Sequence, residues 1–286
     1  MPRRVSSTTT RSHLNDETEY SQAKIGACAE SLLEAYGTRQ PVRPLTEDLP
    51  GLRLEDAYRI QLHQVERWKE QGRVVAGYKV GLTSLAMQRQ LGVTQPDFGH
   101  LFGDMILDGS SVDIDGFLSP RIEPEISFVL KKDLRGPGLS VADVMGAIDY
   151  AIASLEIIDS RIADWKIKLS DTIADNASSG ALVLGTRPVQ LDVADLGLAG
   201  CVLAKNGEVV ATGAGAAVLG HPLNGVLWLA NKLGSLGQTL EAGSVVMAGS
   251  ITAAIPVAAG DTITATFAHL GSVSARFAAA TTEVAA

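Results

Sequence analysis

Hydrophobic residues in the first quarter of the chain recur at intervals of three and four positions, which is the spacing of a helix with one buried face. The spacing predicts one helix over about residues 19–36 and a second over about residues 54–71. A loop at residues 38–51, which contains three prolines, separates the two helices. The residues that approximate one face of the second helix are Leu54, Ala57, Tyr58, Leu62, Val65 and Trp68.

After about residue 73 the apolar runs become short and are separated by turn residues, which is typical of strands. The run 74–80, which Gly81 closes, predicts a first strand, and the run 121–130 predicts another. Further strands are predicted at 181–184, 200–205, 208–211, 244–248, 262–267 and 272–277, with one helix at about 222–234. Helices at the front and strands at the back do not alternate as they do around a parallel sheet, so the pattern favours an α+β fold with a closed or rolled sheet.

One more helix is predicted in the middle of the chain. Ser140 and Asp143 form a capping-box sequence that opens it. Its buried stripe consists of Val141, Val144, Met145, Ile148, Ile152 and Leu155. The helix is therefore expected to run up to Glu156, whereas the turn-forming residues 94–100 are expected to form a loop.

Two glutamates that flank a proline are the most informative feature of the run 121–130. Side chains alternate along an extended strand, so Glu123 and Glu125 point to one face and the apolar side chains to the other. Like charges this close raise each other's pKa unless a cation lies between them. Oxygen ligands of this kind suit a hard divalent ion such as Mg²⁺ or Mn²⁺.

A third carboxylate, Glu156, lies in an apolar run, where an unpaired charge is costly. Three carboxylates that need a common counter-charge predict a metal site. The alternative is that Glu123 and Glu125 form the solvated face of a half-buried strand. Pro124 weakens that alternative because a proline lacks a ladder donor and indicates an edge or a bulge.

Three further polar features are candidates for chemistry. Lys79 ends an apolar strand between Gly77 and Gly81, which allow close approach of a ligand or of backbone, although a strand lysine is more often a surface residue. Asp97 or His100 can do acid–base work, although an aspartate in a loop more often caps a turn. The polar cluster 171–180 is either a capped turn or a set of hydroxyl and amide groups that hold a substrate carboxylate.

Composition excludes several classes of function. The 286 residues carry 24 basic and 32 acidic side chains, a net charge of −8, which argues against nucleic acid or an anionic membrane as the main partner. Cys28 and Cys201 lie far apart in the sequence and form no CxxC motif, which predicts free thiols in a reducing cytoplasm. No apolar stretch approaches the roughly 20 residues that span a bilayer. Residues 1–13 are basic and rich in serine and threonine, which predicts a disordered tail.

Seven motifs spaced along the chain carry a family resemblance. They are Gly77–Thr83, Gln95–Leu101, Pro120–Ile126, Leu155–Arg161, Ala174–Ser179, Val218–Pro222 and Leu270–Val273. In this order they resemble the hydratase/decarboxylase family of aromatic meta-cleavage pathways, within the fumarylacetoacetate hydrolase superfamily. The resemblance covers about residues 22–278. It implies a β-roll or distorted barrel with flanking helices, divided into a tail at 1–20, a helical segment at 21–73 and a catalytic domain at 74–280.

The resemblance also implies roles for individual residues. The glutamates would be the ligands of Mg²⁺ or Mn²⁺, and the groups for acid–base work and substrate orientation would be Lys79 and Asp97. Ser178 would contact the substrate carboxylate, while Arg161 and Trp165 would shape the wall of the site. The metal ligands implied in this way are Glu123, Glu125 and Glu156.

Two activities follow from the resemblance. The segments 95–100 and 161–168 are more similar to 2-oxopent-4-enoate hydratases, whereas 213–218 and 249–254 are more similar to 4-oxalocrotonate decarboxylases. The first pair lies nearer the expected site, so hydration of 2-hydroxypenta-2,4-dienoate is the main prediction and decarboxylation the alternative. A C–C hydrolase is a further alternative, but those enzymes share a His-Glu pair that this sequence lacks. The expected partners are a small 2-oxo or 2-hydroxydienoic acid and further copies of the same chain.

Overall fold

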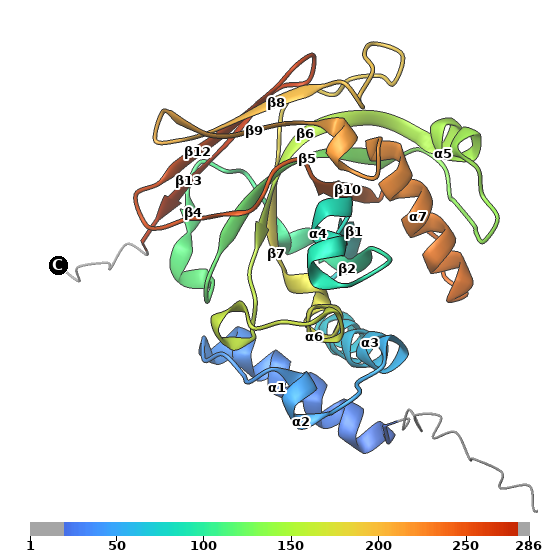
Figure 1. Cartoon of the computed structure of the whole chain (residues 1–286), viewed down its shortest axis with the longest axis vertical. Helices are drawn as coiled ribbons and strands as arrows, with labels where there is room; N and C mark the ends of the chain where they lie inside the picture. Colours follow the sequence, from blue (N-terminus) through green and yellow to red (C-terminus); the bar gives the residue numbers. More distant parts are fainter. Residues whose placement is uncertain (1–19, 280–286) are drawn as a thin grey trace, which may run out of the picture.

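The computed structural model describes residues 20–279, so all of the tail expected over residues 1–20 except Tyr20 lies outside the described residues. Figure 1 shows two curved β-sheets, with the first helices grouped at one end and another helix beside the larger sheet. This arrangement confirms the α+β fold with rolled sheets that the sequence predicts.

The larger sheet has eight strands and supplies most of the buried centre. Its strands follow the order β2-β1-β10-β5-β6-β7-β3, with β11 paired beside β5. Their bounds are β1 Val75–Gly81, β2 Asp97–Phe102, β3 Ile106–Leu107, β5 Arg121–Leu130, β6 Ile148–Ile158, β7 Ser179–Leu184, β10 Val245–Ser250 and β11 Ile255–Pro256.

The smaller sheet has five strands in the order β4-β13-β12-β8-β9. Their bounds are β4 Val112–Asp113, β8 Gly200–Lys205, β9 Glu208–Ala214, β12 Thr262–Phe267 and β13 Gly271–Ala278. Strands β12 and β13 pack against β6 of the larger sheet. Phe277 of β13 and Leu155 of β6 accordingly belong to one buried cluster, so the two sheets share a core.

Helices cover the ends and one side of the sheets (Figure 1). The α-helices are α1 Gln22–Thr38, α2 Leu45–Asp48, α3 Leu54–Glu70, α4 Leu85–Leu91, α5 Val141–Ala147, α6 Leu169–Ala174 and α7 Pro222–Ser235. Short 3₁₀ helices are η1 Gly103–Met105, η2 Ile114–Gly116, η3 Ala163–Trp165, η4 Asn176–Ser178 and η5 Gly215–Ala217. Helices α1, α3 and α7 and the strands β1, β5, β7, β8, β9, β10, β12 and β13 lie where the sequence predicts them, within a few residues.

Two buried glutamines attach helix α3 to the strands. Gln61 donates to the carbonyl groups of Phe98 and Ile173, at 2.9 and 2.8 Å. Gln64, one turn away, donates to the carbonyl of Ala174 at 2.7 Å. Buried amides need such partners, so these contacts fix the N-terminal helices against β2 and α6.

The helix predicted between Ser140 and Glu156 is wrong over most of its length. Helix α5 ends at Ala147, and the chain continues as strand β6. β6 lies between β5 and β7, and nearly all of its residues are buried on both faces. A strand with two buried faces loses the alternation of apolar and polar residues, so its pattern resembles a buried helix.

Two smaller expectations are also corrected. The loop predicted at residues 94–100 is a strand from Asp97 onward, because β2 pairs antiparallel with β1 and is buried along its whole length. Of the two expectations for Pro124, the edge is wrong, since β5 has neighbours on both sides, and the bulge agrees with an irregular pairing nearby. The carbonyl of Pro124 accepts from Ile251 just past the end of β10, where the pairing of β10 with β5 is irregular. Pro124, which has no N–H group, therefore lies where the hydrogen bonding between β5 and β10 is interrupted.

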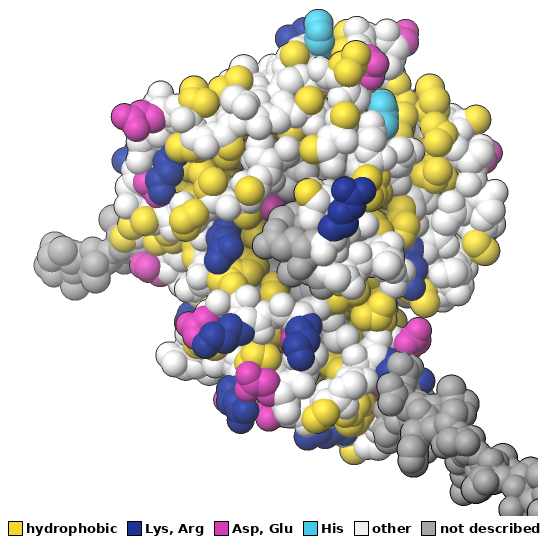
Figure 2. Space-filling model, viewed as in Figure 1, with side chains coloured by type: hydrophobic (Ala, Val, Ile, Leu, Met, Phe, Trp, Pro, Cys, Tyr) yellow, Lys and Arg dark blue, Asp and Glu magenta, His cyan; other side chains and the backbone are white. Residues whose placement is uncertain are grey.

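Figure 2 shows basic and acidic side chains mixed over the N-terminal helices on the face in view. Several are paired there, for example Arg43 with Glu47 at 2.8 Å. Among the described residues, no helix combines the length and the apolar character needed to cross a membrane.

Candidate active site

Three glutamates converge on one face of the larger sheet. Glu123 of β5 and Glu156 of β6 are direct cross-strand partners, and Glu125 lies two residues further along β5. Direct partners and residues two apart share a face. One carboxylate oxygen from each of the three residues lies within 4.8 Å of the other two. The structure thus brings the three predicted ligands together, with Glu156 on a strand instead of at the end of a helix.

Burial makes the three negative charges costly. Burial raises the pKa of Glu123 to about 7, and the nearby charge of Glu156 contributes to the rise. The pKa of Glu125 is raised well above its usual value for the same two reasons. Glu125 accepts a hydrogen bond from Gly249 N–H at 2.9 Å, but neither oxygen of Glu156 has a hydrogen-bond partner among the described residues. The convergence of three carboxylates, and the Glu156 oxygens without a hydrogen-bond partner among the described residues, fit a hard divalent cation.

Lys79 lies beside this acidic cluster. The side chain is buried, and its Nζ lies 3.4 Å from Glu156 Oε1 and donates to the carbonyl of Ala177 at 3.0 Å. Burial lowers the pKa of Lys79, but the nearby carboxylates, Glu156 first, outweigh burial and raise it above its usual value. Lys79 is therefore a fixed positive charge at the edge of the site.

Asp97 begins β2 directly opposite Gly81 of β1. A Cβ at position 81 would overlap Asp97 Oδ1 and would lie 3.3 Å from Lys79 Nζ, so only glycine allows this approach. Burial raises the pKa of Asp97, an effect that the charge of Lys79 opposes. Asp97 Oδ1 is buried without a hydrogen-bond partner among the described residues. The carboxyl group is thus close to the lysine and has capacity to hold a proton.

The polar cluster forms a tight turn after helix α6. Asn176, Ala177 and Ser178 all have positive φ angles, of 50°, 52° and 54°. Asn176 holds the turn to β2, because its side chain accepts from His100 N–H at 2.8 Å and donates to His100 C=O at 2.9 Å. Left-handed backbone at non-glycine residues costs energy and persists only where its surroundings enforce it. The turn directs the Ala177 carbonyl to Lys79.

Ser178, the predicted carboxylate contact, is in this same turn. Its Oγ lies 3.2 Å from the Oγ1 of Thr172, and the Thr172 side chain is close enough to Asp97 to lower the pKa of that carboxyl group. Thr172 therefore connects Ser178 with Asp97. The only sequence signal for a role of Thr172 in the site is its position inside the polar cluster 171–180.

Arg161 has a different position from the one expected. The side chain is fully buried, and its guanidinium bonds to the side chain and carbonyl of Asp175 and to the carbonyl of Ser179. It also lies over the ring of Tyr36 at 4.2 Å. Arg161 thus holds both ends of the turn that carries Ser178, and these contacts lie behind the turn instead of at the three carboxylates.

Trp165 lies at the rim of the site. Its Nε1 donates to Ser119 C=O at 3.1 Å, and the Arg121 guanidinium lies 4.6 Å from its ring centroid. Arg121 is two residues before Glu123 on β5 and therefore points to the same face. This contact places Trp165 beside the acidic cluster.

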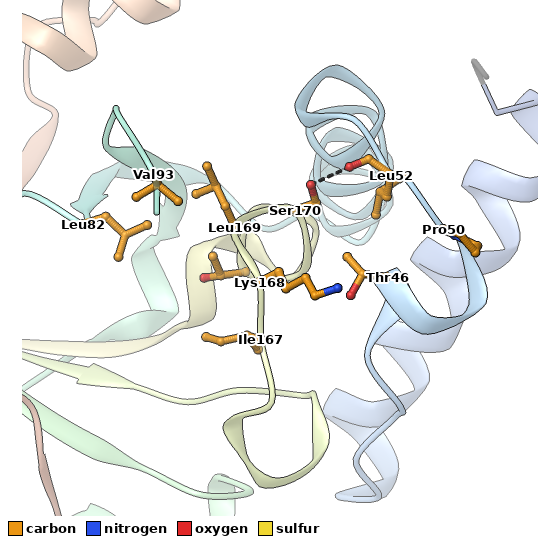
Figure 3. Close-up of a pocket in the computed structure, with 11 residues that line it drawn as sticks. Thr46, Pro50, Leu52, Leu82, Val93, Ile167, Lys168, Leu169 and Ser170 are labelled. Atoms are coloured by element: carbon orange, nitrogen blue, oxygen red, sulfur yellow. Dashed lines mark hydrogen bonds between the residues drawn. The ribbon is translucent and has the colours of Figure 1, made fainter. Parts of the chain in front are cut away.

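A cavity of about 720 Å³ lies next to these residues. Its lining does not include the glutamates, but it contains Thr172 and Leu82, the residue after Gly81. Figure 3 shows aliphatic side chains of Leu82, Val93, Ile167 and Leu169 around it. Thr172 lowers the pKa of Asp97 and Leu82 follows Gly81, which lies against Asp97, so two of the lining residues are close to the candidate acid–base group.

Rolled sheets that bring buried carboxylates, a lysine and an aspartate together near a cavity define an enzyme that acts on small molecules. The chain belongs to the fumarylacetoacetate hydrolase family, because residues 89–278 match the sequence profile of the fumarylacetoacetate (FAA) hydrolase C-terminal family.

Relatives with known names are similar over almost the whole chain. The 2-keto-4-pentenoate hydratase of Paraburkholderia xenovorans (strain LB400) is 44% identical over 250 residues, which cover 87% of this chain and 93% of the relative. The 4-oxalocrotonate decarboxylase of Pseudomonas putida is 45% identical over 255 residues, covering 89% and 97%.

A solved structure of a relative is similar to this chain in fold as well as in sequence. The 4-oxalocrotonate decarboxylase from Pseudomonas putida G7, complexed with magnesium and adipate, superimposes with a TM-score of 0.88 at 44% identity, covering 91% of this chain and 99% of that one. The family resemblance and the fold expected from it are confirmed.

Proposed function

We propose that this protein is a hydro-lyase of aromatic meta-cleavage catabolism. It adds water to 2-hydroxypenta-2,4-dienoate, the enol form of 2-oxopent-4-enoate, and forms 4-hydroxy-2-oxopentanoate. The observation that carries the proposal is the convergence of Glu123, Glu125 and Glu156 beside Lys79 and Asp97. Relatives with hydratase names at 44% identity support it.

Glu123, Glu125 and Glu156 would hold a divalent cation, Mg²⁺ or Mn²⁺. The magnesium complex of the decarboxylase relative supports this assignment. When bound, such an ion supplies Lewis acidity at the 2-oxo acid end of the substrate. The three carboxylates then carry compensated charge, which removes the cost of their burial.

Lys79 would stabilise negative charge on the C2 oxygen. Its ammonium is already fixed by Glu156 and by the Ala177 carbonyl, so little reorganisation accompanies the reaction. A preoriented charge of this kind stabilises the transition state more effectively than mobile water does. The Oγ of Ser178 would donate to the substrate carboxylate, with Trp165 at the rim of the site. Arg161 would act indirectly by holding the turn that carries Ser178.

Asp97 would move the protons. In the first step the C2 hydroxyl loses its proton and C5 gains one, so the dienol becomes a conjugated 2-oxo-3-enoate. In the second step water adds its hydroxyl to C4 and a proton reaches C3. Burial raises the pKa of Asp97, which helps this carboxyl group to hold a proton as well as to accept one.

Decarboxylation of 2-oxohex-3-enedioate is a second candidate, supported by the similarity to the decarboxylase relatives. In that reaction the C5–C6 bond breaks, CO₂ leaves, and the electron pair moves along the chain to the C2 oxygen. Both reactions use the same charge stabilisation at C2.

A turnover assay tests the proposal. Freshly generated 2-hydroxypenta-2,4-dienoate is incubated with the protein and Mg²⁺ or Mn²⁺, and loss of dienol absorbance and formation of 4-hydroxy-2-oxopentanoate are followed. We expect turnover that EDTA abolishes and added metal restores. Parallel assays with 2-oxohex-3-enedioate measure CO₂ release. Faster CO₂ release than hydration would favour the decarboxylase, and a rate unaffected by EDTA would contradict the metal assignment.

We also propose that the chain forms a homo-oligomer. The outer strands β8 and β9 expose Val202, Val209 and Val210, with 41, 64 and 45% of their surfaces accessible. Neighbouring exposed apolar side chains on adjacent strands are typical of surfaces that associate. Light scattering on the purified chain measures the mass directly, and a monomer would contradict this proposal.

A further inference from the structure

The cavity beside Thr172 has two chemically different sides. Leu82 and Val93 lie on one side, with Leu169 and Ile167 between them and the other side (Figure 3). Thr46, Ser170 and the end of the Lys168 side chain lie on the other side. The aliphatic side adjoins the acid–base group, because Leu82 follows Gly81, which lies directly against Asp97.

The side-chain hydroxyl groups that line this cavity are already engaged by the protein, that of Thr172 with Ser178 at 3.2 Å. Ser170 Oγ donates to the carbonyl of Leu52 at 2.6 Å. Thr46 donates from both N–H and Oγ1 to the carboxylate of Asp171, at 2.8 Å each. These groups therefore have no donor left for a second carboxylate on a ligand.

Lys168 is the only cation that lines the cavity within the described residues, and its side chain is exposed. Figure 3 shows its amino group on the Thr46 side, away from Leu82 and Val93. An ion pair with an exposed, flexible lysine contributes little to affinity. Contact with four aliphatic side chains, by contrast, favours hydrocarbon in proportion to the area removed from water.

We propose that this cavity is the specificity pocket for the C5 end of the substrate and that it selects 2-oxo acids with an uncharged hydrocarbon substituent there. Asp97 acts at C5 in the proposed reaction, so a substituent on C5 points past Asp97 and Thr172 into the cavity. The inference rests on the proposed function in one respect. That function places the 2-oxo acid end of the substrate at the three glutamates, so the C5 end faces the cavity. A substrate with a distal carboxylate would place that charge among aliphatic side chains.

Binding of unreactive analogues tests the pocket without turnover. The Mg²⁺-loaded full chain is titrated calorimetrically with 2-oxopentanoate, 2-oxohexanoate, 2-oxooctanoate and the dicarboxylate 2-oxoadipate. We expect affinity to rise by about threefold for each added methylene. We also expect 2-oxoadipate to bind about tenfold more weakly than 2-oxohexanoate, because its second carboxylate loses water without gaining a partner.

Variants place the effect in the cavity. Val93→Phe fills the aliphatic side and is expected to lower the ratio of 2-oxooctanoate to 2-oxopentanoate affinity about tenfold. Ile167→Phe serves the same purpose if Val93→Phe fails to fold. Val193→Phe, at an exposed valine outside the cavity lining and the proposed oligomer surface, is the matched control and should keep the wild-type ratio.

The outcomes separate the two proposals. Equal affinities for all chain lengths, or a chain-length effect that Val93→Phe and Ile167→Phe leave intact, would overturn the pocket assignment while dienoate turnover still supported the hydratase. Preferential binding of 2-oxoadipate, lost in Lys168→Met, would show that the pocket takes a carboxylate. If no acid binds and the dienoate is not turned over, both proposals fail.

Discussion

The side-chain amide of Asn176 forms two hydrogen bonds with the backbone of His100: it accepts from the N–H at 2.8 Å and donates to the C=O at 2.9 Å. This contact holds three successive left-handed residues in place. One of them, Ala177, supplies the carbonyl that fixes Lys79. The position of Lys79, the lysine proposed to act in catalysis, therefore depends on an asparagine for which no contact with Lys79 is seen.

Asn176→Asp tests this dependence. The change keeps the acceptor but sets a carboxylate oxygen against the His100 carbonyl, which should cost about 1–3 kcal/mol of unfolding free energy. Displacement of the turn should also lower kcat by up to about 100-fold. Asn231 of α7 makes the same paired contact with the backbone of Leu139, far along the chain from the site residues. Asn231→Asp should lower stability alone, and an equal loss of kcat in both variants would contradict the role of the turn.

Removal of one ligand charge should separate metal binding from folding. Without metal, Glu125→Gln relieves repulsion among buried carboxylates and keeps the bond from Gly249, so its unfolding free energy should rise. With Mg²⁺ at about 100 times the wild-type dissociation constant, the wild type should gain about 2.7 kcal/mol and the variant far less. Chemical denaturation with EDTA or Mg²⁺ measures both effects. Glu208→Gln, at an exposed position of β9, is the control; similar Mg²⁺ stabilisation of all three proteins would argue against these ligands.

Asp97→Asn should abolish proton transfer and leave the fold intact. General acid–base groups contribute factors of about 10² to 10⁴ to the rate, so kcat should fall in that range. The affinity for 2-oxopentanoate should change much less, since this carboxyl group is not needed to hold the 2-oxo acid end. Asp149→Asn, an exposed position on β6, is the matched control. Retention of more than about a tenth of the wild-type kcat would exclude Asp97 as the proton carrier.

His100 predicts a specific acid sensitivity. Burial lowers the pKa of His100 to about 3, with the charge of Lys69 adding to the effect. A group whose folded pKa is depressed contributes stability above its unfolded pKa, near 6.5, and that stability is lost as the pH falls toward 3. The slope is about 1.4 kcal/mol per pH unit. Denaturation curves measure the unfolding free energy at each pH. Between these pH values it should fall less steeply with decreasing pH in His100→Gln than in the wild type.

His269→Gln, at an exposed histidine, is the control for that experiment and should keep the wild-type slope. Because buried carboxylates also titrate in this range, only the difference between wild type and variant reports on His100. Parallel curves for all three proteins would show that His100 is not responsible.

The sequence by itself determined the α+β class, most of the strands other than β2 and β6, and the three glutamates proposed as metal ligands. Alternation along a strand is a local property, so Glu123 and Glu125 necessarily share a face wherever the strand lies. The apolar setting of Glu156 likewise indicated a buried charge that needed a partner. These conclusions depend on near neighbours in the chain, which the sequence displays directly.

Only the tertiary structure decided how the remaining parts meet. Glu156 faces Glu123 because β6 lies beside β5. The sequence did not predict this strand, because its burial on both faces gives it the hydrophobic pattern of a buried helix. Arg161 turned out to hold a turn, because its acidic partner comes 14 residues later at Asp175. The specificity pocket combines residues from 46–52, 82, 93 and 167–172. Long-range packing creates such a surface, and no local pattern of hydrophobic residues encodes it.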